Sequence, residues 1–237
     1  MVQNNFIATI LTLILALIWL RLNDYLANKG IIEGPLSRKI IHIGTGPIFV
    51  LCWLFFNDTT AARYLAAIIP LGITLQFALV GMGLIKDQAS VDALTRHGDR
   101  KEILYGPMFY GIVFVLLTII YWYDSPIGII ALMLLCGGDG LADVIGKRVK
   151  SKGLPWTKGK TVSGSAAMFF GGLVFAVVVM WIFINAGKFP GTLTDYLPAI
   201  VVMAFVGTLI ETLPFKDIDN LTITLSAIVL GHLFFAV

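Results

Sequence analysis

The chain has 237 residues, of which 58% are hydrophobic and only 13% charged, and its mean hydropathy is +0.90. Too few charged residues are present to cover a water-soluble domain, so the composition excludes the soluble classes and indicates a membrane protein. In such a protein the formal net charge of +3 chiefly reports orientation, and we expect the lipid bilayer and no nucleic acid as a partner. The two cysteines, Cys52 and Cys136, lie in apolar stretches and predict neither a disulfide framework nor a zinc site.

Eight apolar runs predict an all-α, polytopic integral membrane protein with about eight transmembrane helices. A spanning helix needs roughly 20 apolar residues, so the first and last runs are marginal in length. The sequence has no internal repeat and no long linker, which predicts a single domain over residues 1–237. The runs cover residues 6–20, 40–56, 64–85, 103–123, 126–145, 164–186, 196–213 and 221–237.

Basic residues alternate strongly between the connections that join these runs. The connections after the first, third, fifth and seventh runs hold 15 of the 17 Lys and Arg residues. The positive-inside rule therefore predicts that these connections are cytoplasmic and that both termini lie on the other side. The first run lacks a basic n-region and a cleavage site, so we expect a retained helix. No Arg- and Ser-rich extension precedes it, which favours a bacterial (including cyanobacterial) inner or thylakoid membrane over a plastid precursor.

Polar residues mark the starts of the second and fourth runs. Helical spacing places Arg38 and His42 on one face at the start of the second run. A single histidine here is more typical of a structural hydrogen bonder than of a catalyst, although it stays a candidate base. The fourth run follows Arg100-Lys101-Glu102 and opens on Gly106-Pro107, which by itself is typical of a helix start at the membrane surface.

The fifth run contains two acids four residues apart, Asp139 and Asp143, which one face of a helix would present together. A charged side chain in hydrocarbon costs at least about 2.5–3.5 kcal/mol, so the pair requires a cavity, a counter-ion or a metal. Glycines around the acids would let another helix or a ligand approach the backbone closely. Hard oxygen ligands without a thiolate or a histidine pair favour Mg²⁺ over zinc. The alternative is an ion pair that only holds the helices together.

The connection after the fifth run carries six basic residues and leads directly into the sixth run. Thr161 or Ser163 can cap that helix, and the free N–H groups of its first turn would form an anion site suited to a polyphosphate. A basic loop that touches lipid headgroups is the alternative. A P-loop is excluded because Leu154 stands where the motif requires glycine. The candidate binding residues are Lys147, Arg148, Lys158, Lys160, Thr161, Ser163, Gly164 and Ser165.

A third acid, Glu211, lies near the cytoplasmic end of the seventh run and is a candidate metal ligand or base. Asp219 and Asn220 follow just before the eighth run. They either bind the ligand or cap the last helix.

Together these segments resemble the polyprenol kinase and cytidylyltransferase family of membrane enzymes, and they match it in order along nearly the whole chain. The segments Arg38–His42 and Glu102–Pro107 favour its phytol and farnesol kinase branch. The other matching stretches are Gly138–Asp143 with Gly146–Arg148, Lys160–Ser165, and Glu211 with Asp219 and Asn220.

The resemblance implies transfer of a phosphoryl group, usually from CTP, to the hydroxyl of a long isoprenoid alcohol, such as phytol in salvage for tocopherol and quinone synthesis. On this hypothesis Asp139 and Asp143 hold Mg²⁺ on the nucleotide, and Lys160 neutralises charge on the transferring group. Glu211 or His42 would orient or deprotonate the alcohol. The remaining nucleotide-binding residues would be Arg38, Lys147, Arg148, Lys158, Thr161, Ser163, Gly164, Ser165, Asp219 and Asn220.

Two alternatives stay open. A cytidylyltransferase would use the same groups to make a CDP-lipid. A transporter would use the acids as ion or proton sites, although the sequence shows no inverted repeat. The donor base, the chain length of the alcohol, the general base and the oligomeric state are left undecided by the sequence.

Overall fold

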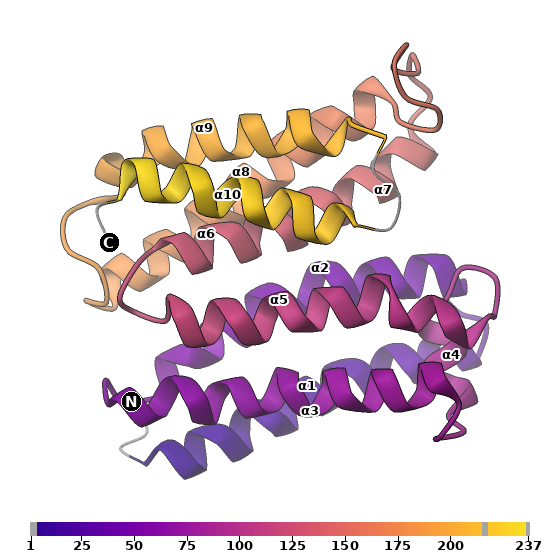
Figure 1. The fold of residues 1–237 in the computed structure, drawn as a ribbon, viewed down its shortest axis with the longest axis horizontal. Coiled ribbons are helices and arrows are strands. Elements are labelled where there is room, and N and C mark those ends of the chain that lie inside the picture. Colours follow the sequence, from indigo (N-terminus) through magenta and orange to yellow (C-terminus); the bar gives the residue numbers. More distant parts are fainter. Residues whose placement is uncertain (1–3, 215–217, 236–237) are drawn as a thin grey trace. The chain divides into compact units, whose positions relative to one another are not determined.

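The computed structural model describes residues 4–214 and 218–235, which are helical with one isolated β-bridge between Gly153 and Thr161 (Figure 1). The chain forms two compact units, Met1–Ile119 and Ile120–Val237. This division does not decide whether the chain acts as one catalytic domain, and the single domain stays a prediction.

Within the described residues, seven helices are long and apolar enough to cross a membrane, which confirms the all-α polytopic class. The first helix is longer than its apolar run, because it continues through polar residues to Asn28. The eighth apolar helix has only 16 residues, and the end of its predicted run, 236–237, lies outside the described residues. The main helices are α1 (Asn5–Asn28), α2 (Gly34–Cys52), α3 (Thr60–Met82), α5 (Gly106–Ile120), α8 (Val162–Asn185), α9 (Leu193–Glu211), α10 (Asp219–Phe234) and the composite span Ile127–Arg148.

The first unit packs α1 against α2, α3 and the short helix α4 (Gln88–Leu94), while the 3-10 turn η2 (Arg100–Leu104) packs on α3 and leads into α5. The apolar runs did not predict α4, which has only seven residues and is capped by Asp87. Its buried residues Val91 and Leu94 join a core with Phe77 and Ile103. Few residues of α1 are buried, so most of that helix presents an apolar surface.

The second unit is built around the span Ile127–Arg148, most of which is buried. This central span consists of α6 (Ile127–Met133), a π-helical segment η3 (Leu134–Asp139) and α7 (Gly140–Arg148). Helix α8 packs along it, and α9 and α10 complete the bundle. A π-helical segment adds a residue to the turn and is often found at functional sites.

Helix α8 contacts the central span through glycines. A Cβ on Gly171 would lie 2.6 Å from the carbonyl oxygen of Gly137, and one on Gly146 would lie 3.3 Å from Cα of Gly164. The later residue of the span meets the earlier residue of α8, so the two helices are antiparallel. The sequence predicted that either another helix or a ligand would come close to the backbone around the two acids. In the structure that neighbour is the helix α8, as small residues in membrane helices allow.

Candidate active site

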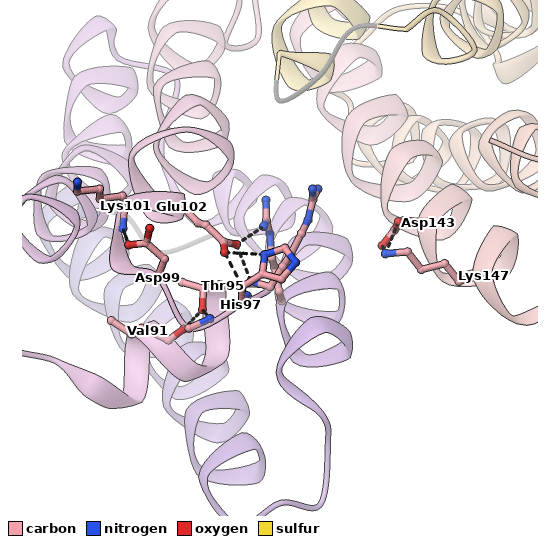
Figure 2. Close-up of polar contacts among 11 residues, drawn as sticks. Val91, Thr95, His97, Asp99, Lys101, Glu102, Asp143 and Lys147 are labelled. Atoms are coloured by element: carbon pink, nitrogen blue, oxygen red, sulfur yellow. Dashed lines mark hydrogen bonds and ion pairs between the residues drawn. The ribbon is translucent and has the colours of Figure 1, made fainter. Parts of the chain in front are cut away.

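The two acids of the central span have different surroundings. Asp139 ends the π-helical segment and is only 6% exposed. The side chain of Asp143 is 28% exposed and forms an ion pair with Lys147 of its own helix, with Nζ and Oδ1 2.8 Å apart (Figure 2). The spacing predicted two acids in equivalent surroundings. Instead, Asp139 is buried, while Asp143 is more accessible and is paired with a lysine.

Lys160 reaches from the connection before α8 to the end of α9. Its Nζ donates to Oε1 of Glu211 at 2.6 Å and also to the backbone carbonyl of Glu211. The side chains are only 22% and 10% exposed. Asp139 and Asp219 lie within electrostatic range of Glu211. We call these four residues, one lysine and three acids, the Lys160 cluster.

The connection between α7 and α8 folds back on itself as a short hairpin. The N–H of Leu154 donates to the carbonyl of Lys160 at 2.9 Å, and the N–H of Val162 donates to that of Lys152 at 3.0 Å. Gly159 has a φ of +86°, a left-handed conformation that favours glycine at this turn. The hairpin directs Lys160 toward Glu211 and leaves Lys158 exposed at the turn.

Thr161 caps α8 as predicted, but the N–H groups of the first turn are not free. The N–H of Gly164 donates to the Thr161 hydroxyl at 3.2 Å, that of Ser163 to the Ser151 hydroxyl at 3.0 Å, and that of Ser165 to the Thr161 carbonyl at 3.0 Å. The prediction of free donors for a phosphate is therefore wrong in this arrangement, because the hairpin supplies their acceptors. The Ser165 hydroxyl is buried and has no hydrogen-bond partner among the described residues.

The two segments that suggested the phytol and farnesol kinase branch contact each other in the first unit. Glu102 lies 3.9 Å from the Arg38 guanidinium, and a Cβ on Gly106 would collide with the same group. Glu102 also accepts the N–H groups of Arg96 and His97 at 2.6 and 3.1 Å (Figure 2). The expected helix start is confirmed, since η2 begins at Arg100 and α5 at Gly106, and Glu102 in addition organises the loop before it.

His42 has the surroundings of a structural residue. Its ring lies 4.3 Å from that of Tyr110, centroid to centroid, and its carbonyl accepts the Tyr110 hydroxyl at 2.6 Å. Its role as a base stays a prediction. At the start of α10, Asn220 is buried and Asp219 accepts the N–H of Asn220 at 3.2 Å, while Asp219 also belongs to the Lys160 cluster.

Among the described residues, no group of three or more His, Cys, Asp or Glu side chains is arranged to hold a metal ion. Mg²⁺ at nucleotide sites is commonly held by one or two carboxylates together with phosphates and water, rather than by a cage of protein ligands. Asp139 and Asp143 are two carboxylates one helical turn apart and fit that simpler donor set.

Buried acids that contact a lysine in a multi-pass helical bundle are typical of a functional site in a membrane protein. The chain is 38% identical over 236 residues to probable phytol kinase 3 of Glycine max, covering 97% of this chain and 72% of that protein. It is 33% identical over 214 residues to phytol kinase 1 of Arabidopsis thaliana (90% and 70%) and 34% identical over 212 residues to the farnesol kinase of that plant (89% and 69%).

The chain therefore belongs to the phytol and farnesol kinase family, whose named members are isoprenoid alcohol kinases. No protein-family profile matches the chain, and no solved structure matches it.

The predicted bacterial membrane is wrong. The relatives reported above are all named chloroplastic and are plant proteins. The prediction depended on where the chain begins, which does not decide whether a targeting segment belongs to the protein.

Proposed function

We propose that this protein is a plastid-membrane kinase that transfers the γ-phosphoryl group of CTP to phytol and so makes phytyl phosphate for tocopherol and quinone synthesis. The alcohol oxygen forms a bond to the γ-phosphorus, the bond from that phosphorus to the β,γ-bridging oxygen breaks, CDP leaves, and the hydroxyl proton is released. The observation that carries the proposal is the Lys160 cluster, because buried acids in contact with a lysine in a membrane bundle are typical of a functional site.

Lys160 is the group that we assign to the transferring phosphoryl. An ammonium has three donors, so Lys160 can keep its bond to the Glu211 carboxylate while another N–H meets a phosphate oxygen. Charge spreads over the phosphoryl oxygens in the transition state, and a preorganised cation stabilises that charge. Glu211 is then a positioning residue that holds the lysine in place.

Asp139 and Asp143 would hold Mg²⁺, which when bound neutralises charge on the nucleotide phosphates. Asp143 would exchange its contact with Lys147 for this role, which releases an exposed lysine beside the phosphates. Arg148 is one residue further along and also exposed, so both cations can neutralise the polyphosphate.

The test uses purified protein in lipid nanodiscs with γ-labelled CTP, UTP or ATP and a panel of alcohols from farnesol to dolichol. We expect labelled phytyl phosphate, made fastest with CTP. A parallel reaction with α-labelled CTP detects a cytidylyltransferase, which would place the label in the lipid and release pyrophosphate. Absence of labelled lipid with every alcohol would refute the kinase activity.

A matched pair of variants tests the role of Lys160. Lys160→Ala should lower kcat by at least about 100-fold, as expected for losing a group that stabilises transition-state charge. Lys152→Ala removes an exposed lysine from the same connection and should leave kcat within about twofold, because surface charges contribute little. Equal losses in the two variants would indicate a general effect of positive charge and not a site.

A further inference from the structure

A small cavity lies in the first unit between α1, α3 and α4, away from every residue of the Lys160 cluster in the sequence. Its volume is about 20 Å³. Four polar side chains line it: Arg21 and Asp24 of α1, Gln76 of α3 and Ser90 of α4. None of them has a part in the phosphoryl transfer proposed above.

The polar side of the cavity offers both acceptors and donors. The Asp24 carboxylate is buried and forms an ion pair with Arg21, with Oδ2 and Nη1 3.2 Å apart. Ser90 donates to the Asp87 carboxylate at 2.7 Å, and the Gln76 side chain bonds to that same carboxylate. Together they form a hydrogen-bonding wall of fixed geometry.

The opposite side of the cavity is apolar and continues onto the surface of α1. Leu17, Leu20, Phe77 and Leu94 complete the lining. Leu17 is exposed, and so are Ile14 and Ile18 on the same helix. Few residues of α1 are buried in the protein, so we expect this apolar surface to meet the hydrocarbon of a bilayer.

The volume decides what the cavity can take. A cavity needs about 10–15 Å³ to hold one water molecule, so this one admits a single hydroxyl-sized group and excludes a nucleobase or an isoprenoid chain. A hydroxyl has one donor hydrogen and two acceptor lone pairs. Asp24 can accept that hydrogen, while Arg21 and Gln76 can donate to the oxygen.

We propose that this cavity captures the hydroxyl end of a long-chain alcohol from the bilayer, while the apolar chain lies along α1 past Leu17. The substrate class depends on the proposed function, since the isoprenoid alcohol is the acceptor there. The cavity assigns the alcohol a binding site of its own in the first unit.

The experiment uses the wild-type protein in nanodiscs and a phytol analogue with a photoactivatable diazirine near the hydroxyl. After irradiation, mass spectrometry maps the labelled peptides. We expect labels within residues 14–24 or 76–94, removed by excess phytol but not by phytane, the hydrocarbon that lacks the hydroxyl. Labels found only elsewhere, or equal competition by phytane, would overturn the proposal.

Variants then test the polar wall. Asp24→Asn and Ser90→Ala should each reduce labelling at least fivefold, with KM for the nucleotide unchanged. The matched control is Asp92→Asn, an exposed acid of α4 that bonds Gln88 and does not line the cavity. Leu17→Trp fills the apolar mouth at an exposed position, so it gives the same test if Asp24→Asn does not fold.

The results separate this site from the proposed function. Specific labelling here without phosphoryl transfer to any alcohol would leave the binding site standing and remove the kinase activity. Transfer to phytol with no specific labelling here would leave the kinase activity standing and remove the binding site.

Discussion

The ion pair between Lys160 and Glu211 allows a double-mutant cycle that separates its structural and chemical roles. The substitutions are Lys160→Met and Glu211→Gln, which remove each charge with little change in shape. The two groups are 2.6 Å apart and mostly buried. Breaking a buried pair by removing one partner typically lowers the free energy of unfolding by about 3–5 kcal/mol, because the other charge stays buried without a counter-ion.

The cluster predicts that the two single variants are unequal. Lys160→Met leaves Glu211 within electrostatic range of Asp139 and Asp219 with no lysine, so it should cost the full 3–5 kcal/mol or so. Glu211→Gln leaves Lys160 its hydrogen bond to the backbone carbonyl of residue 211 and should cost less. Adding Glu211→Gln to Lys160→Met should then recover about 1–3 kcal/mol, because it removes the carboxylate left without its lysine. The coupling between the two residues is this recovery plus the cost of Glu211→Gln alone.

The assay is equilibrium unfolding in mixed micelles, with phosphoryl transfer measured on the same samples. We expect the double variant to regain stability over Lys160→Met but to remain inactive, because no cation is restored at the phosphoryl group. If the double variant is less stable than Lys160→Met by the full cost of Glu211→Gln, the reasoning about the cluster is wrong. If activity returns with stability, Lys160 acts only in folding.

Three further predictions follow from single sites. Asp139→Asn should abolish transfer while the protein still inserts, and chelation with EDTA should do the same to the wild type until Mg²⁺ is restored; an active Asp139→Asn protein contradicts the metal role. Gly171→Ala should lower the free energy of unfolding by about 1–3 kcal/mol, measured in micelles, because its methyl would meet the Gly137 carbonyl at 2.6 Å. Burial raises the pKa of Asp87, but hydrogen bonds from Ser90, the charge of Arg21 and a hydrogen bond from Gln76 together hold this pKa below its ordinary value of 3.8. The free energy of unfolding of the wild type should therefore exceed that of Asp87→Ala above about pH 4, and this difference should disappear as the pH falls through the lowered pKa. Unfolding measured in micelles across this pH range tests it, and a difference in stability that does not change with pH would refute it.

Hydropathy was sufficient to predict the helical class and most of the spans, because each apolar run must form its hydrogen bonds internally in lipid. The glycines around Asp139 also predicted a close backbone contact, and Thr161 was correctly predicted as a cap. These features depend on neighbouring residues, which the sequence displays directly.

The parts that the sequence did not predict depend on residues far apart or on backbone geometry. Lys160 and Glu211 are 51 positions apart, and no periodicity connects them. The hairpin that occupies the first N–H groups of α8 requires Ser151, an ordinary serine by sequence. The π-helical segment before Asp139 has the same apolar composition as a regular helix, and only the paired glycines at 137 and 138 hint at it.

The contact between α8 and the central span restricts which parts of the second unit can move during a catalytic cycle. At Gly171, not even one methyl group fits between the two backbones, so sliding or rotating one helix against the other would bring main-chain atoms into collision. Asp139 is carried by this rigid pair and stays where it is. Lys160 lies outside this pair and is held by Glu211 at the end of α9, so its placement relative to Asp139 depends on the packing of α9 and not on the contact between α8 and the span.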